Sequence, residues 1–95
     1  MSVAIHMDLL GLKARDKVTG FEGVVSTVSF DLYGCVQVVL TPPVDKDGAS
    51  RDGKWFDAAR LFVLDDQPVM TVPDFDDGPV ADGSHGPAEK PGIPA

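Results

Sequence analysis

The chain has 95 residues, with eight Lys and Arg against 15 Asp and Glu, a formal net charge of −7, one cysteine and one tryptophan. A chain of this length forms one small domain, and its core is too small to enclose a deep catalytic cleft. The single Cys35 excludes an intramolecular disulfide framework and a zinc site with several cysteine ligands. No apolar run approaches the roughly 18 residues of a membrane-spanning helix, and the first residues lack the regions of a signal peptide. We therefore expect a cytoplasmic protein without a membrane anchor.

The charge is divided unevenly along the chain, and this division indicates where the folded domain ends. Residues 1–64 carry seven basic and eight acidic side chains, whereas residues 65–95 carry one basic and seven acidic, with six of the eight prolines. A segment of the second kind buries too little apolar surface to offset its loss of chain entropy. We expect an N-terminal arm or short helix over residues 1–12, a small β domain over residues 13–72 and an extended acidic tail over residues 73–95.

The first predicted elements are an arm, a strand and a bend. Ile5, Leu9 and Leu12 lie at helical spacing, which favours a helix in the arm. A short strand is expected over residues 14–18. The bend that follows contains Gly20 and Gly23, and the absence of a Cβ lets both adopt positive φ.

A β-hairpin is the next predicted element. Residues 23–30 and residues 35–41 each alternate apolar side chains at the period of two that is typical of a strand. Residues 31–34 between them have the length and the glycine of a hairpin loop. Val24, Val28 and Phe30 are expected to share one face of the first strand with Ser26, and Val36, Val38 and Leu40 to share one face of the second.

The remaining elements complete a barrel. Pro42 and Pro43 end the second hairpin strand, and a polar loop leads to a short strand over residues 54–57. One helical or 3₁₀ turn follows, and a buried strand over residues 61–64 closes the domain. A further short edge strand is expected over residues 68–73, with a proline at each end. The fold class is therefore mainly β: a small five-stranded barrel with one short helical turn and an extended C-terminal tail.

No catalytic or metal-binding constellation emerges. If Gly48 is the sixth residue of a calcium loop, Lys54 stands at the twelfth position, where the ion requires a bidentate Glu. His6 and His85 have no ligand partner at zinc spacing. Cys35 lacks a base, so it is interpreted as a small packing residue. We expect no enzyme activity, no metal and no cofactor.

Two resemblances rest on particular residues. The strand that ends at Lys17-Val18, the glycine turn of residues 20–23, the hairpin, the single helical turn and the closing strand together resemble SH3-like barrels and the KOW motif within them. Residues 17–25, 33–37 and 55–61, with Pro42-Pro43, resemble small bacteriophage-encoded proteins of unassigned function. The resemblances imply an SH3-like fold and a phage origin.

Two sets of residues are candidates for binding. The first set is apolar and mostly aromatic, as interface anchors are; it contains Phe21, Tyr33, Trp55, Phe56, Val69, Met70 and Phe75. The second set would contact an anion or a nucleotide, with basic side chains alternating along the first strand beside the glycine turn; it contains Lys13, Arg15, Lys17, Gly20, Gly23 and Arg60.

Three functions fit these patterns. The expected one is a virion-associated structural protein, either a capsid decoration or a head–tail accessory, present in the host cytoplasm during synthesis. It would bind copies of itself or a capsid protein through a barrel face and the terminal arm, with no membrane and no direct nucleic-acid contact. The first alternative is an oligomer that sequesters a nucleotide signal of host defence. The second is a KOW-like module that contacts RNA or protein, which the net charge of −7 disfavours.

Overall fold

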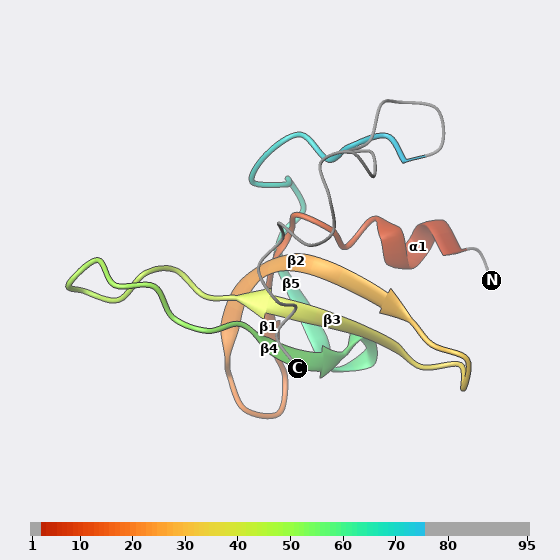
Figure 1. The fold of residues 1–95 in the computed structure, drawn as a ribbon, viewed down its shortest axis with the longest axis horizontal. Coiled ribbons are helices and arrows are strands. Elements are labelled where there is room, and N and C mark those ends of the chain that lie inside the picture. The colour runs from red at the N-terminus through yellow and green to blue at the C-terminus, as the bar shows by residue number, and fades with distance from the viewer. Residues whose placement is uncertain (1–2, 76–95) are drawn as a thin grey trace, which may run out of the picture.

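The structure is a computed structural model that describes residues 3–75 (Figure 1). Its elements follow in chain order: helix α1 (Val3–Met7), strands β1 (Lys13–Asp16), β2 (Glu22–Phe30), β3 (Val36–Thr41) and β4 (Lys54–Asp57), the 3₁₀ turn η1 (Ala58–Arg60) and strand β5 (Leu61–Asp65). Neighbouring strands run antiparallel in one sheet with the order β4-β3-β2-β1-β5. The chain is therefore mainly β, with five strands and one helical turn before the last strand, as the sequence predicts. No ladder joins β4 to β5 within residues 3–75, so the described sheet has β4 and β5 as its two edges. Most of the expected acidic tail, residues 76–95, lies outside the described residues.

The β2–β3 hairpin projects beyond the rest of the sheet (Figure 1). Its loop is closed by the Asp31 N–H, which donates to the Cys35 carbonyl at 3.1 Å. The Asp31 carboxylate accepts the N–H groups of Tyr33 and Cys35, each at 2.9 Å. Gly34 turns the chain at a φ of 89°. The predicted loop over residues 31–34 is confirmed.

A bulge in β2 changes which of its residues face the core. The pairing with β3 shifts between Val25 and Thr27, so one extra residue breaks the period of two. As a result Val25 is buried in the core, while Val24 is only half-buried. The prediction that Val24 shares a face with Val28 is therefore wrong, since Val28 packs against the core. Phe30 is also exposed, because it lies at the end of the hairpin, where its ring meets that of His6 edge-on.

The core is small and takes side chains from all five strands. Its fully buried members are Ala14, Val25, Val38 and Leu40, with Leu9, Phe21, Val28, Phe56, Ala58 and Leu61 packed around them. Strand β3 supplies Val38 and Leu40 to this core, while Val39 is buried on its opposite face. The predicted alternation along β3 is therefore confirmed. The final strand differs from expectation, since only Leu61 of β5 packs inward and the rest of that edge strand is exposed.

The polar loop between β3 and β4 contains a turn, over residues 45–49, that has the same hydrogen-bond pattern as the hairpin loop. The Asp45 N–H donates to the Ala49 carbonyl at 2.9 Å, and the Asp45 carboxylate accepts the N–H groups of Asp47 and Ala49. Gly48 has a φ of 83°. The Asp45 side chain is thus used by the turn itself.

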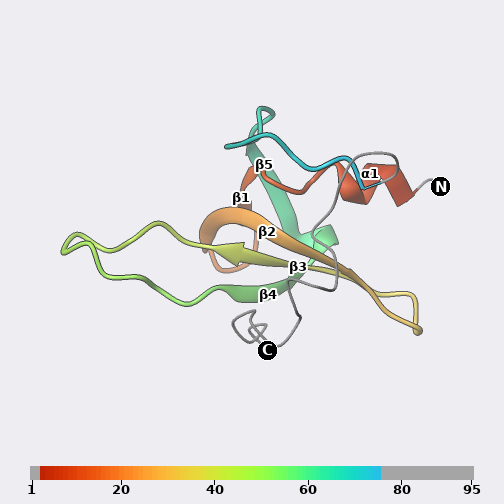
Figure 2. The same cartoon turned by 45° about the horizontal axis from the view of Figure 1, so that its top comes forward.

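The N-terminal residues and residues 66–75 lie side by side on one side of the sheet (Figures 1 and 2). The Val69 N–H donates to the Gly11 carbonyl at 2.9 Å. A Cβ on Gly11 would lie 3.2 Å from the Pro68 side chain, so the two segments are in close contact. The edge strand predicted over residues 68–73 does not form, because this segment crosses the turn after α1 instead of extending a sheet edge. No helix among residues 3–75 is long and apolar enough to cross a membrane.

Candidate functional site

The most distinctive surface feature is an apolar groove between the sheet and residues 66–75. It consists of two adjoining hollows of about 510 and 350 Å³, which share Val24, Ser26 and Val69. The lining of the first also includes Pro42, Pro43 and Leu64, with Lys13 and Glu22 as its charged members; that of the second includes Leu10, Met70, Val72 and Phe75. We call this surface the apolar groove.

Three local features of the sequence build the apolar groove. The bulge in β2 places Val24 on the face opposite the core. Pro42 and Pro43 cannot donate ladder hydrogen bonds, so β3 ends beside Val24 and leaves this face uncovered. The hydrogen bond from Val69 to Gly11 holds residues 66–75 along the far side. The groove is therefore formed by the folded domain together with the arm and the start of the predicted tail.

The predicted interface residues separate into three groups. Val69, Met70 and Phe75 line the apolar groove and are 50%, 71% and 50% exposed. Tyr33 lies at the tip of the β2–β3 hairpin and is almost fully exposed. The other three are half-buried: Phe21 just before β2, and Trp55 and Phe56 on β4.

Phe21 and Phe56 contribute to the core instead of a surface. Their rings are 5.4 Å apart and tilted, and both pack against the buried cluster. Trp55 lies opposite Val39 and Phe56 opposite Val38, so the two rings point to opposite faces, as alternation predicts. Sequence reasoning missed Val24, Leu64 and the two prolines as groove residues. The bulge that turns Val24 outward leaves no clear mark in an alternating apolar run.

The predicted basic residues are not brought together. Strand β1 ends at Asp16, so Lys17 lies in the following turn and not on the face of Lys13 and Arg15. Arg15 is 3.5 Å from the Glu22 carboxylate and lies over the Phe62 ring. The strand prediction extended too far, because the turn hydrogen bond from Gly20 to the Asp16 carbonyl already begins there.

The two glycines of the bend have different roles. Gly20 has a φ of 79° and open space around the position of a Cβ, as expected for a turn glycine. Gly23 does not have positive φ, which corrects the prediction for this residue. A Cβ on Gly23 would lie only 2.6 Å from the Thr41 carbonyl oxygen. Gly23 is needed because the backbones of β2 and β3 approach closely there.

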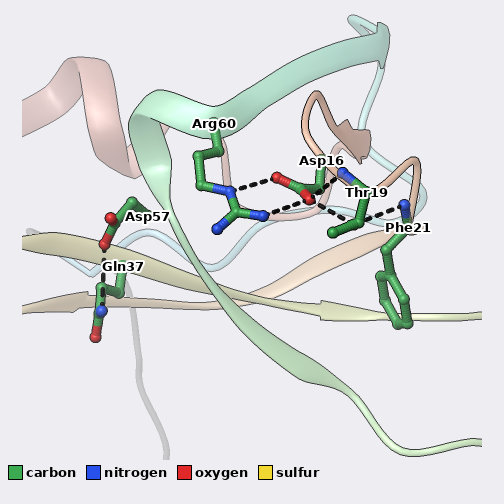
Figure 3. A network of polar contacts seen from close by, with 6 residues as sticks. All are labelled: Asp16, Thr19, Phe21, Gln37, Asp57 and Arg60. Carbon is green, nitrogen blue, oxygen red and sulfur yellow. Dashed lines mark hydrogen bonds and ion pairs between the residues drawn. The ribbon is translucent and has the colours of Figure 1, made fainter.

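Arg60 belongs to a polar network centred on the buried carboxylate of Asp16 (Figure 3). Its Nε and Nη2 atoms donate to the two carboxylate oxygens of Asp16, each at 2.7 Å. The N–H and hydroxyl groups of Thr19 donate to the same carboxylate. Asp16 is fully buried, and both of its carboxylate oxygens accept hydrogen bonds, from Thr19 in the turn after β1 and from Arg60 at the end of η1. Figure 3 shows the Gln37–Asp57 hydrogen bond as a separate contact on the sheet.

This network has a clear electrostatic consequence. The hydrogen bonds from Arg60 hold the pKa of the Asp16 carboxyl well below its usual range, although burial opposes the shift. The same contact raises the pKa of Arg60. Arg60 thus acts as an internal counter-ion that fixes η1, and with it the start of β5, against β1.

Cys35 is exposed in the hairpin loop, so its interpretation as a packing residue is wrong. The loop places it before β3 begins at Val36, away from the core. The negative charge of Asp31 raises the pKa of the Cys35 thiol, and the charge of Asp57 and a partial loss of solvent contact act in the same direction. A raised pKa lowers the thiolate fraction and hence the nucleophilicity of this side chain.

Within residues 3–75, no group of three or more His, Cys, Asp or Glu side chains is arranged to hold a metal ion. His85 lies outside the described residues. No family model matches the chain, and no curated protein or solved structure matches it.

Proposed function

We propose that the chain is a structural, virion-associated phage protein that binds neighbouring protein subunits through the apolar groove. The observation that carries this proposal is the groove itself, a continuous apolar surface on a domain whose core holds only a few buried side chains. Contiguous exposed apolar surface is characteristic of interaction sites, because burying it against a partner is favourable.

The exposed groove residues suit a protein partner. Met70 is 71% exposed, and a flexible thioether side chain adapts to the shape of a partner surface. Phe75 offers a large ring at the end of the second hollow. Removing apolar surface from water contributes about 25 cal/mol per Å², so a few such side chains supply several kcal/mol of binding free energy.

The groove also joins the two parts that the sequence assigns to attachment. One wall is the sheet, and the other is residues 66–75, which the hydrogen bond between Val69 and Gly11 holds in place and which lead into the predicted tail. A partner in the groove would therefore contact both the β domain and the segment that leads into residues 76–95. This arrangement supports the proposal of a domain that binds one subunit while its terminal arm reaches another.

The nucleotide-binding alternative has less support. Arg15 and Arg60 face carboxylates, and Lys17 lies apart from Lys13, so residues 3–75 bring no cluster of free positive charge to the Gly20 turn. The KOW-like module remains a weaker proposal for the same reason, since phosphate contacts require accessible basic side chains.

The experiment compares particles assembled with wild-type protein and with Met70→Asp. A carboxylate in an apolar contact must be desolvated without a partner, so we expect Met70→Asp to lower the number of copies per particle at least tenfold. Leu32→Asp is the matched control, because Leu32 is 94% exposed at the hairpin tip and lies outside the groove. Unchanged occupancy of Met70→Asp would show that the groove is not the attachment surface.

A further inference from the structure

The sequence of the last strand, β5, predicts a buried strand, but most of its side chains are exposed in the structure. Four of its five residues, Leu61 to Leu64, are apolar, a pattern typical of a strand that is buried on both faces. Yet Phe62, Val63 and Leu64 are 51%, 37% and 41% exposed. Since β5 pairs with β1 on one side only, its other side is an open edge among the described residues.

The second edge of the sheet is protected in the usual way. Strand β4 has only four residues, begins with Lys54 and ends with Asp57, and both charged side chains are exposed. Short length and charged side chains prevent an edge strand from pairing with another chain. In β5 the only charged residue is Asp65 at its end. An irregularity in the β1–β5 ladder lies beside that end, between the pairs of Lys13 and Ala14, and the edge formed by Leu61–Val63 is regular. The Leu61 N–H is not open, because it donates to the Ala58 carbonyl of η1.

We infer that β5 pairs with β5 of a second copy of the chain, antiparallel, to form a two-fold symmetric dimer with one continuous sheet. Edge-to-edge pairing satisfies the open backbone groups of both strands and brings their apolar side chains together. In a two-fold dimer the same surface serves both partners, so a self-complementary edge is required.

The charges around β5 make the edge self-complementary. At its start lies Lys17, whose N–H donates to the Arg60 carbonyl at 2.8 Å, while the charge of Arg60 itself is used by the ion pair with Asp16. Acidic residues lie at its end, where Asp65 is followed by Asp66. Antiparallel pairing places the start of each strand against the end of the other, so opposite charges meet twice. Parallel pairing would bring like charges together at both ends.

The inferred surface adjoins the apolar groove but does not coincide with it. The regular edge is Leu61–Val63, whereas the groove is lined by Leu64 of the same strand together with Val24, Val69 and Met70. Each copy in the dimer would therefore keep a groove available for another subunit. The inference does not depend on the proposed function, and the two have separate readouts.

The first experiment measures the mass of the full chain in solution over a range of concentrations by sedimentation equilibrium. A pairing of short strands buries less area than a standard interface, so we expect a reversible monomer–dimer equilibrium and not a permanent dimer. The variant Phe62→Lys introduces a charge into the regular edge and is expected to weaken dimerisation at least tenfold. Its matched control is Leu32→Lys, which places the same charge at the exposed hairpin tip and should leave the equilibrium unchanged. Circular dichroism confirms that each variant is folded.

The second experiment tests the antiparallel arrangement by exchanging charges. Lys17→Glu and Asp66→Lys each create like-charge contacts at both ends of the paired strands, and each is expected to weaken the dimer about tenfold. The double variant restores opposite charges and should dimerise like the wild type.

Several results would overturn the inference. A wild-type chain that stays monomeric up to about 1 mM has no such interface. A dimer that survives Phe62→Lys uses another surface. A double charge variant no better than either single variant shows that the two ends do not meet. Met70→Asp should dimerise normally, so that its failure to attach to particles would bear on the groove alone.

Discussion

Replacing Gly23 with alanine tests the close approach of β2 and β3 at the base of the hairpin. The new Cβ would lie 2.6 Å from the carbonyl oxygen of Thr41, 2.7 Å from its carbonyl carbon and 3.0 Å from its nitrogen. All three are backbone atoms, so the clash is relieved only by moving β3 away from β2 by several tenths of an ångström. Overpacking of this kind costs about 1–3 kcal/mol. A domain of this size has a free energy of unfolding of about 4–11 kcal/mol, so the loss is a large fraction of the total.

The neighbouring Gly20 supplies the matched control, because its need for glycine has another cause. Its φ of 79° is unfavourable for alanine, and nothing lies within 4 Å of a Cβ there. Alanine at this position costs about 1–2 kcal/mol, while asparagine tolerates the left-handed region better. At position 20, asparagine should therefore destabilise the fold less than alanine does. At position 23, asparagine should destabilise it at least as much as alanine.

Urea unfolding measures all four variants, with the fluorescence of Trp55 as the signal, because this single tryptophan is half-buried on β4. The slope of unfolding free energy against urea should be unchanged, which shows that only stability differs. If Gly23→Ala is as stable as the wild type, or if Gly23→Asn is more stable than Gly23→Ala, the steric explanation is refuted.

Four further predictions follow from the described contacts. The folded state lowers the pKa of Asp16, so the ionised carboxylate stabilises the fold fully above the unfolded pKa near 4, and this stabilisation is lost as the pH falls below that value. The free energy of unfolding of the wild type should therefore fall between about pH 4 and pH 2, as measured by urea titration. Asp16→Asn should be less stable than the wild type at pH 7 and should depend less on pH in the acid range. Leu40→Ala should lower the free energy of unfolding by about 2–5 kcal/mol, measured by thermal denaturation, since Leu40 is fully buried. Asp31→Ala removes the acceptor of two backbone N–H groups and should accelerate amide exchange of Tyr33 and Cys35, followed by NMR. Cys35 should alkylate more slowly than free cysteine at pH 8 despite its exposure, and Asp31→Asn should speed the reaction.

The elements with strong local signals could be predicted from the sequence. The hairpin loop of residues 31–34 follows from an aspartate that accepts two N–H groups and a glycine with positive φ. The alternation of β3 and the opposite orientations of Trp55 and Phe56 follow from the period of two. The single helical turn between β4 and β5 was also predicted, and it is η1.

The predictions that failed depend on contacts between distant residues. The bulge in β2 is set by pairing with β3, so the inward face could not be assigned from β2 alone. Residues 68–73 have the composition of an edge strand, but contact with Gly11 fixes them across the N-terminal turn. The sequence predicts a strand over residues 14–18, but β1 ends at Asp16. The turn that ends it is stabilised by Arg60, which is 44 residues away in the sequence and gives no local signal.

The same limit applies to the candidate site. Val69, Met70 and Phe75 could be recognised as exposed apolar residues in a polar segment, and the structure places all three on the apolar groove. Val24 and Leu64 join them only because of the bulge and the edge position of β5. The basic residues looked like one patch in the sequence, whereas ion pairs with Asp16 and Glu22 separate them in the fold.

The most direct test of the central claim is the copy number of the chain in purified particles of the phage that encodes it, measured by quantitative mass spectrometry against the major capsid protein. If the protein is a structural component bound through the apolar groove, its ratio to the capsid protein is fixed between preparations, at one or a simple fraction, and falls for Met70→Asp but not for Leu32→Asp. Absence of the chain from purified particles, or a ratio that varies with the degree of purification, would contradict the proposed function.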